Sequence, residues 1–123
     1  MERVTGIGGV FIRSTRPDEL RAWYAENLGL DIGADWGGAV FTSAGDETLT
    51  WAVFPGDTDY FGSHGQQAMV NYRVRDLDAM LAQLRAAGAS VDPEVQELEF
   101  GRFGWATDPD GNRLELFEPA TGH

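Results

Sequence analysis

The stretch Phe103-Gly-Trp-Ala-Thr-Asp-Pro-Asp-Gly-Asn-Arg-Leu-Glu-Leu-Phe-Glu-Pro119 is typical of two strands joined by a tight turn. Asp108-Pro-Asp-Gly111 favours the turn, because proline fixes φ and glycine accepts a positive φ. After the turn, Leu114 and Leu116 alternate with polar or aromatic neighbours, which is the period of a half-buried strand. Glu115 is therefore expected on the face opposite the two leucines. A carboxylate there is either a chemical group in a concave site or half of an ion pair.

The length and composition indicate a single globular domain. The chain has 123 residues, of which 42% are hydrophobic, so it is long enough to form a core. No apolar run approaches the ~20 residues that a membrane-spanning helix needs, so we expect no membrane insertion. The chain contains no cysteine, which excludes disulfides and zinc-thiolate sites and favours a cytoplasmic location.

The charge balance is strongly acidic, with a net charge of −11. This charge argues against nucleic acid as a partner, because phosphate binding needs a basic surface. It permits a cationic ligand, which a negative protein attracts over a distance, although a merely solvated acidic surface is the simpler explanation. All the basic residues are arginines, so the chain has no lysine for Schiff-base chemistry or for a phosphate-binding loop.

The same order of elements is predicted twice. A strand at 4–13 precedes a helix that Thr15 could cap and that Gly29 ends, and three short strands follow at 30–34, 39–43 and 48–54. The apolar residues of this helix recur at helical spacing, namely Leu20, Trp23, Tyr24 and Leu28. Gly37-Gly38 and Gly45-Asp46 mark the turns between the strands.

After a polar linker at 55–67 the order repeats. A strand at 68–74 precedes a helix that Asp76 caps and Gly88 ends, and strands follow at 90–95, 102–107 and 112–117. The sequence thus predicts an α+β fold of two tandem βαβββ modules, spanning about 4–54 and about 68–119.

This order of elements, together with two sequence motifs, resembles the vicinal oxygen chelate superfamily. The motifs are Trp23-Tyr-Ala-Glu-Asn-Leu-Gly-Leu30 and Thr107-Asp-Pro-Asp-Gly-Asn-Arg-Leu-Glu-Leu116. The superfamily includes glyoxalase I, extradiol dioxygenases, fosfomycin-resistance enzymes and bleomycin-resistance proteins. The resemblance covers nearly the whole chain and implies an eight-stranded sheet curled around a concave interior, here called the cup. It also implies a homodimer.

In metal-using members a ligand lies on the first and the last strand of each module, typically His or Gln and then Glu. The resemblance implies that these positions are Gly9, Trp51 (or Thr50 if the register shifts by one), Met69 and Glu115. Only Glu115 has a ligand side chain, and one oxygen ligand does not make a divalent-metal site. We therefore predict no metal and no cofactor, unless a metal uses residues outside the family pattern.

The family's ligand positions and strand alternation together predict which residues line the cup. They are Phe11, Arg13, Trp51, Met69, Asn71, Arg73, Trp105, Arg113 and Phe117. Aromatic walls with a few polar groups are typical of a small-ligand pocket, but the same aromatics could simply fill the interior of the sheet. Glu115 is the candidate catalytic residue, as a general acid or base whose pKa an apolar cup would raise. Alternatively, it pairs with Arg13, Arg73 or Arg113.

The linker could form a lid or rim over the cup, through Asp57, Asp59, Tyr60 and His64. A lone loop histidine such as His64 is more often solvated than catalytic.

Three functions follow as hypotheses. The first is binding of a small organic molecule, cationic or aromatic, as a bleomycin-resistance protein does, without a metal. The second is a glyoxalase-like lyase or isomerase that uses Glu115 as base or in an atypical metal site. The third is an interaction module without a ligand. Family resemblance alone does not name the ligand.

Overall fold

The computed structural model describes residues 1–42, 47–62 and 65–120. The predicted turn at Gly45-Asp46 and the candidate His64 lie outside these residues. In chain order the elements are β1 (Val4–Ser14), α1 (Pro17–Leu28), β2 (Gly38–Thr42), β3 (Thr48–Pro55), β4 (Ala68–Val74), α2 (Leu77–Ala86), β5 (Ser90–Val91), β6 (Gln96–Leu98), β7 (Gly101–Thr107) and β8 (Arg113–Pro119). Among the described residues, no helix is long and apolar enough to cross a membrane.

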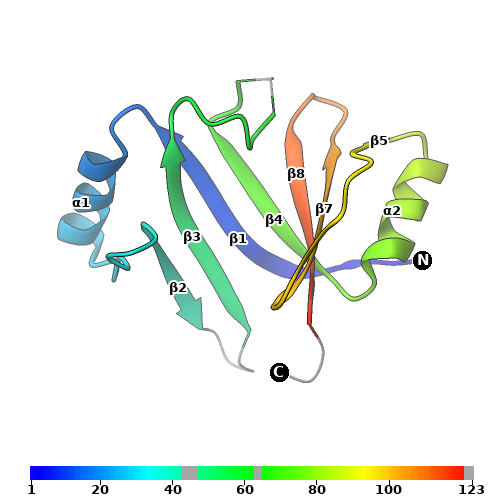
Figure 1. Cartoon of the computed structure of the whole chain (residues 1–123), viewed down its shortest axis with the longest axis horizontal. Helices are drawn as coiled ribbons and strands as arrows, with labels where there is room; N and C mark the ends of the chain where they lie inside the picture. The colour runs from blue at the N-terminus through cyan, green and yellow to red at the C-terminus, as the bar shows by residue number, and fades with distance from the viewer. Residues whose placement is uncertain (43–46, 63–64, 121–123) are drawn as a thin grey trace.

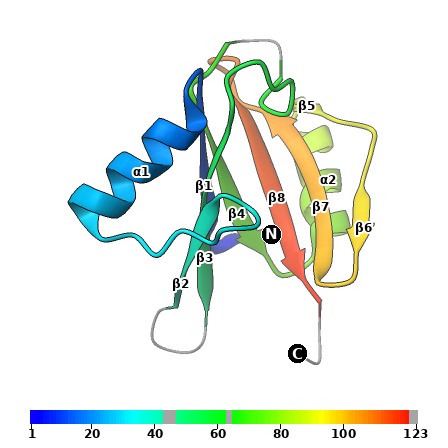
Figure 2. The ribbon, with the colours of Figure 1, turned by 60° about the vertical axis from the view of Figure 1, so that its left-hand side comes forward.

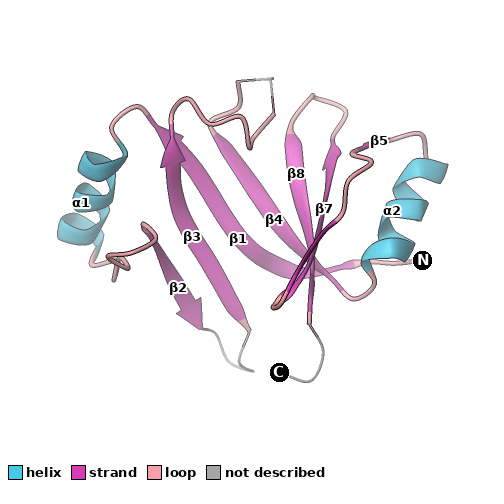
Figure 3. Cartoon of the chain, in the orientation of Figure 1, coloured by secondary structure: helices cyan, strands magenta, loops and turns pink. Residues whose placement is uncertain are grey.

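The eight strands of the described residues belong to one mixed sheet with the order β2-β3-β1-β4-β8-β7-β5, and β6 pairs with β7. The two central strands, β1 and β4, are antiparallel, while β3 runs parallel to β1 and β8 runs parallel to β4. Figure 1 shows the sheet curled into an open cup with one helix outside each end, and Figure 3 shows the same arrangement by secondary structure. The turned view in Figure 2 keeps both helices on the outside. The predicted α+β fold is confirmed.

One predicted strand is absent, and another is shorter than predicted. The segment 30–34 is not a strand, because the Gly33 N–H bonds to the Gly38 oxygen at 2.8 Å and the Gly37 N–H bonds back to Gly33 at 3.1 Å. The predicted strand at 90–95 stops at Val91, since Pro93 has no N–H to continue the ladder, and pairing resumes in β6. Within the described ranges, the first half of the chain therefore contributes three strands and the second half five.

The two helices begin differently. Thr15 does not cap α1, because the N-cap residue is Arg16 and the Ser14 hydroxyl accepts the Arg16 N–H at 3.0 Å. Gly29 ends α1 as predicted, with φ of 69° and its N–H bonded to Ala25. For α2, the Asp76 side chain accepts the Ala79 N–H at 3.0 Å, as predicted, and Gly88 follows the helix end with φ of 85°.

The helices also contribute unequally to the core. α2 packs Leu77, Met80 and Leu81 against Val74 and Leu116 on the outer face of the sheet. By contrast, α1 has no fully buried residue, and about half of the Trp23 side chain and more than half of Leu28 are exposed. A second apolar cluster lies inside the cup and consists of Phe61, Met69 and Trp105, with Phe11, Phe54, Tyr60 and Phe103 packed against it.

Candidate functional site

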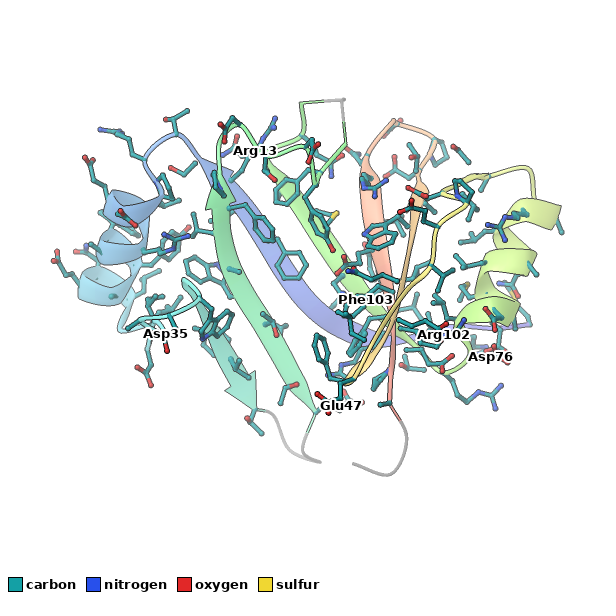
Figure 4. The ribbon with its side chains drawn as sticks, in the orientation of Figure 1. Arg13, Asp35, Glu47, Asp76, Arg102 and Phe103 are labelled. Atoms are coloured by element: carbon teal, nitrogen blue, oxygen red, sulfur yellow. The ribbon has the colours of Figure 1, made fainter. Side chains whose placement is uncertain are left out.

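The most deeply buried acidic group of the cup is Glu115, whose side chain is 1% exposed. Its partner in the parallel register is Asn71, and the Asn71 Nδ2 donates to Oε1 at 2.6 Å. The Tyr60 hydroxyl and the Trp105 indole N–H, at 2.9 Å, both donate to Oε2. The two carboxylate oxygens together therefore accept three hydrogen bonds, all from uncharged donors. Figure 4 shows the side chains of the cup.

Burial raises the pKa of Glu115 above its ordinary value of 4.5. Desolvation outweighs the hydrogen bonds from Tyr60, Asn71 and Trp105 and the charge of Arg113, all of which lower this pKa. Burial is also the main cause that raises the pKa of the Tyr60 hydroxyl above its ordinary 10.0, with Glu115 adding to it. The Tyr60 hydroxyl therefore stays protonated at neutral pH and acts as the hydrogen-bond donor to Glu115.

The described residues between β3 and β4, 56–62 and 65–67, contribute side chains next to Glu115 and β8. Phe61 is fully buried there, and the Tyr60 ring stacks on Phe54 with centroids 5.5 Å apart. Gln66 ties the segment to β8, because its amide donates to the Arg113 oxygen at 2.8 Å and accepts the Arg113 N–H at 2.6 Å. Tyr60, one residue of the predicted lid or rim, therefore contacts Glu115, while the lid itself stays a prediction.

The rest of the cup contains a cavity of about 410 Å³, which we call the aromatic hollow. Its walls include a stacked pair, Phe103 and Phe117, with ring centroids 4.7 Å apart, and Phe100, which meets Phe103 edge to face at 5.7 Å. Figure 4 shows Phe103 inside the cup, well away from Arg13 at the end of β1. The lining residues are Gly8, Phe11, Thr48, Thr50, Asn71, Arg73, Phe100, Phe103, Phe117, Pro119 and Ala120.

Two polar side chains of the hollow each keep a buried atom without a hydrogen-bond partner among the described residues. These atoms are Asn71 Oδ1 and Arg73 Nε. Arg73 donates through Nη2 to the Thr48 oxygen at 2.9 Å and to the Thr48 hydroxyl at 3.2 Å, and its guanidinium carbon lies 5.5 Å from the Phe117 ring centroid. Because buried polar atoms are normally paired, these two atoms need an explanation.

Gly8 makes this arrangement possible. It lies at a β-bulge, since Ile7 pairs with Tyr72 while Gly9 pairs with Asn71. A Cβ at Gly8 would lie 2.3 Å from Asn71 Oδ1, closer than side chains tolerate. Glycine at this position thus lets the Asn71 side chain lie against β1.

Trp51 does not line the cup, contrary to the prediction. Its ring packs against Tyr24 of α1 with centroids 4.7 Å apart, on the outer face of the sheet. The register pairs Gly9 with Thr50, so Thr50 is the β3 residue that faces inward and lines the hollow. A shift of one residue along a strand moves a side chain to the opposite face.

The other predicted lining residues fall into separate groups. Phe11, Asn71, Arg73 and Phe117 line the hollow. Met69 is buried in the apolar cluster with Phe61 and Trp105, while Arg13 lies at the rim, where its backbone N–H bonds to Gln67.

Arg113 lies beyond Trp105, and its guanidinium carbon is 5.3 Å from that ring's centroid. It pairs with Asp92 at 3.4 Å, and none of the described arginines forms an ion pair with Glu115. The predicted alternative of an ion-paired Glu115 is therefore wrong for the described part of the chain. Arg113 also borders a second, more polar cavity of about 640 Å³, which Tyr60, Trp105, Asp59, Asp92 and Glu94 line with it.

The metal that the resemblance implies does not fit this cup. Gly9, Thr50 and Met69 stand at three of the four positions and supply no ionisable ligand. The fourth, Glu115, is surrounded by N–H and O–H donors, whose positive ends would repel a cation. Within residues 1–42, 47–62 and 65–120, no three acidic or histidine side chains lie together as a metal site needs.

Sequence reasoning missed several residues of the site. Phe103 alternates with Trp105 on one strand face, so the same period-2 pattern could have identified it. Tyr60 lies in a segment without periodicity, and no local signal indicates its contact with Glu115. Thr48 and Phe100 were not predicted to line the cavity either.

Comparison with known proteins supports the fold assignment. The structure is similar to methylmalonyl-CoA epimerase from Mycobacterium tuberculosis, with 25% identity, a TM-score of 0.67, and 95% of this chain and 89% of that chain covered. It is also similar to a variant of Streptomyces coelicolor methylmalonyl-CoA epimerase in complex with 2-nitronate-propionyl-CoA. The identity is 16% and the TM-score 0.69, and the match covers 97% of this chain and 100% of that chain. A glyoxalase/bleomycin resistance protein/dioxygenase superfamily member from Vibrio splendidus 12B01 has 12% identity and a TM-score of 0.61, with 96% and 99% covered.

No curated protein sequence matches this chain. A sequence model of one family, however, matches residues 6–116, which is nearly the whole chain. The predicted resemblance is thereby confirmed, and the chain belongs to the Glyoxalase/Bleomycin resistance protein/Dioxygenase superfamily.

Proposed function

We propose that this protein binds a small organic molecule reversibly in the aromatic hollow, without a metal ion and without changing the molecule. The observation that carries the proposal is the hydrogen bonding of Glu115. Its two oxygens accept three hydrogen bonds, from Tyr60, Asn71 and Trp105, and the residue is 1% exposed, so the carboxylate is committed to neighbouring side chains and is shielded from a metal or a substrate.

The hollow has the properties of a small-ligand site. Its volume of about 410 Å³ lies within the usual range of roughly 300–1,000 Å³, and its walls combine phenylalanines with a few polar groups. One solved relative of the same fold is described as a complex with 2-nitronate-propionyl-CoA. That ligand belongs to the relative, but it supports the view that a cup of this kind accepts organic molecules.

Glu115 is better suited to positioning than to acid–base catalysis. A general base must come within hydrogen-bond reach of the proton that it removes. Glu115 is 1% exposed and does not line the hollow. Asn71 does line the hollow, and it connects the hollow to Glu115 through its amide hydrogen bond. Because the Asn71 Nδ2 binds Glu115, the Asn71 carbonyl oxygen is the atom left for other partners.

The charge of the hollow also narrows the types of ligand that we expect it to bind. Arg73 contributes a guanidinium, which disfavours a cationic group at this position. Of the two predicted ligand types, the aromatic one therefore suits the hollow and the cationic one does not.

A fragment screen followed by NMR tests the proposal. Small aromatic molecules of different charge are titrated into labelled protein while the amide signals of Phe103 and Phe117 are followed, and mass spectrometry checks that each ligand is recovered unchanged. We expect saturable shifts that Gly8→Ala abolishes, because its Cβ would lie 2.3 Å from Asn71 Oδ1. Gly6→Ala is the matched control, since its Cβ would meet its neighbours at 3.5 Å or more.

The alternatives give different results. A chemically changed ligand, with turnover lost in a folded Glu115→Gln variant, would establish the lyase or isomerase instead. If no molecule shifts the hollow amides, the interaction module is the surviving hypothesis. That the protein is a cytoplasmic homodimer stays a prediction, and sedimentation velocity measures the dimer directly.

A further inference from the structure

This inference rests on the proposed function and concerns the chemistry of the ligand. We infer that the hollow binds a small aromatic carboxylate. Its carboxylate binds Arg73, and its ring packs against Phe103 and Phe117.

Arg73 is the first reason, because it lines the hollow and its Nε has no hydrogen-bond partner among the described residues. Five other arginines form ion pairs with Asp or Glu at 3.0–3.4 Å, namely Arg16, Arg21, Arg75, Arg102 and Arg113, whereas Arg85 donates to a backbone oxygen. Arg73 is half-buried and its bonds to Thr48 are exposed, so the Nε side is the part of its guanidinium that has left water. Arg73 Nη2 bonds to Thr48, but its Nε is buried without a partner, so this side of the guanidinium still needs an acceptor.

The guanidinium is also held in place for such an acceptor. Its two bonds to Thr48 and its position 5.5 Å from the Phe117 ring centroid restrict it from two sides. A preorganised arginine loses little freedom when it binds a planar carboxylate, which it can contact through two parallel N–H groups. A lone neutral acceptor would use only one of these donors.

The phenylalanines are the second reason, and they indicate an aromatic body for the ligand. Phe103 and Phe117 present a stacked pair at the wall of the hollow, and Phe100 is 61% exposed beside Phe103. Planar rings gain most from such walls through offset or edge contacts. The volume of about 410 Å³ suits a substituted benzene or indole.

Asn71 is the third reason, and it indicates a substituent on the ring. Its Oδ1 is buried without a partner among the described residues, and its amide cannot turn without losing the 2.6 Å hydrogen bond to Glu115. A hydroxyl or amino group on the ligand would supply the missing donor. We therefore expect hydroxy- or amino-substituted aromatic acids to bind better than the unsubstituted acid.

Calorimetric titration tests this inference with matched pairs of probes. The probes are 3-hydroxybenzoate, 4-hydroxybenzoate and 4-aminobenzoate, each beside its own carboxamide, which has the same shape and no charge. We expect at least one carboxylate to bind about tenfold more tightly than its carboxamide, as befits a hydrogen bond to a charged group. Arg73→Gln should remove this preference, and Arg75→Gln should keep it, because the Arg75 side chain is 79% exposed and pairs with Glu2.

The result that overturns the inference is equal binding of acid and carboxamide, an unchanged preference in Arg73→Gln, or no binding of any acid in the panel. If Arg73→Gln does not fold, the comparison of acid and carboxamide on the unmodified protein still decides. Binding of neutral or cationic aromatics at the hollow amides, without binding of the acids, would reject this inference and leave the proposed function intact. Failure of every molecule in the fragment screen would reject both.

Discussion

Asn71 and Glu115 face each other on the parallel strands β4 and β8, and the Asn71 amide donates a 2.6 Å hydrogen bond to the buried carboxylate. This bond connects the polar interior of the cup with the aromatic hollow, because Asn71 lines the hollow and Glu115 does not. Glu115 can in this way determine which atom of Asn71 faces the hollow.

Glu115→Gln should reduce the free energy of unfolding by about 1–3 kcal/mol near neutral pH. A glutamine has one acceptor oxygen, so its NH₂ group would meet at least one of the donors Tyr60, Asn71 and Trp105 and leave it unpaired. Urea denaturation measures the change. Glu99→Gln, at an exposed position, is the control and should alter stability by less than about 0.5 kcal/mol. A Glu115→Gln variant as stable as the parent would contradict the structural role of the carboxylate.

The stability that Glu115 contributes should depend on pH. Because burial raises its pKa in the folded protein above the ordinary 4.5, the folded state holds the proton more tightly than the unfolded state does. The part of the stability that comes from this proton is therefore fully present below about pH 4.5 and is lost as pH rises through the folded pKa. The hydrogen bonds to Tyr60, Asn71 and Trp105 supply the contribution that remains near neutral pH. The measurement is the difference in unfolding free energy between the parent and Glu115→Gln, taken from pH 4 to pH 8. A difference that stays constant, or that grows with pH, contradicts the raised pKa.

Tyr60→Phe should lower stability by about 1 kcal/mol and raise the pKa of Glu115 further, since the Tyr60 hydrogen bond lowers that pKa. Carbon NMR of the Glu115 carboxyl group against pH reports the second effect. Tyr72→Phe is the matched control, because Tyr72 packs on the α2 face of the same strand pair. An unchanged Glu115 titration in Tyr60→Phe would mean that the hydroxyl is not a partner in solution.

Trp51→Ala should destabilise the protein without weakening ligand binding. The Trp51 ring contacts Tyr24 of α1 and is half-buried, so its removal should cost roughly 2 kcal/mol, less than a fully buried tryptophan. Affinity for a ligand found in the screen should remain within about twofold, because the ring lies on the outer face of the sheet. A folded Trp51→Ala variant that no longer binds would show that Trp51 faces the cup after all.

Divalent metals should not stabilise the fold. Metal-stripped protein is heated with Mn²⁺, Fe²⁺, Ni²⁺ or Zn²⁺, and no increase in Tm is expected, because the donors around Glu115 exclude a cation. A bound metal at a hundred times its Kd would add about 2.7 kcal/mol, which is several degrees for a chain of this length. A shift of that size, with stoichiometric metal by elemental analysis, would restore the metalloenzyme hypothesis.

Local sequence patterns were sufficient for the elements that local physics controls. The Asp76 cap and the left-handed Gly29 depend on groups within four residues, so they could be read directly from the chain. The alternation around Glu115 likewise placed it opposite Leu114 and Leu116 before the sheet was known, because successive side chains of a strand point to opposite faces. The order of elements then indicated the family and its curled sheet.

Tertiary structure decided the site itself. Trp51 and Thr50 exchange faces with a shift of one residue, and only the pairing of β3 with β1 sets that register. The donors that surround Glu115 come from positions 55, 44 and 10 residues away, one of them in a segment without periodicity. Which atoms converge there depends on how the sheet curls and where the segment before β4 packs, and both result from contacts between residues distant in the chain. The residue types and their strand faces were therefore determined by the sequence alone, whereas the polar partners and the cavity beside them exist only in the folded chain.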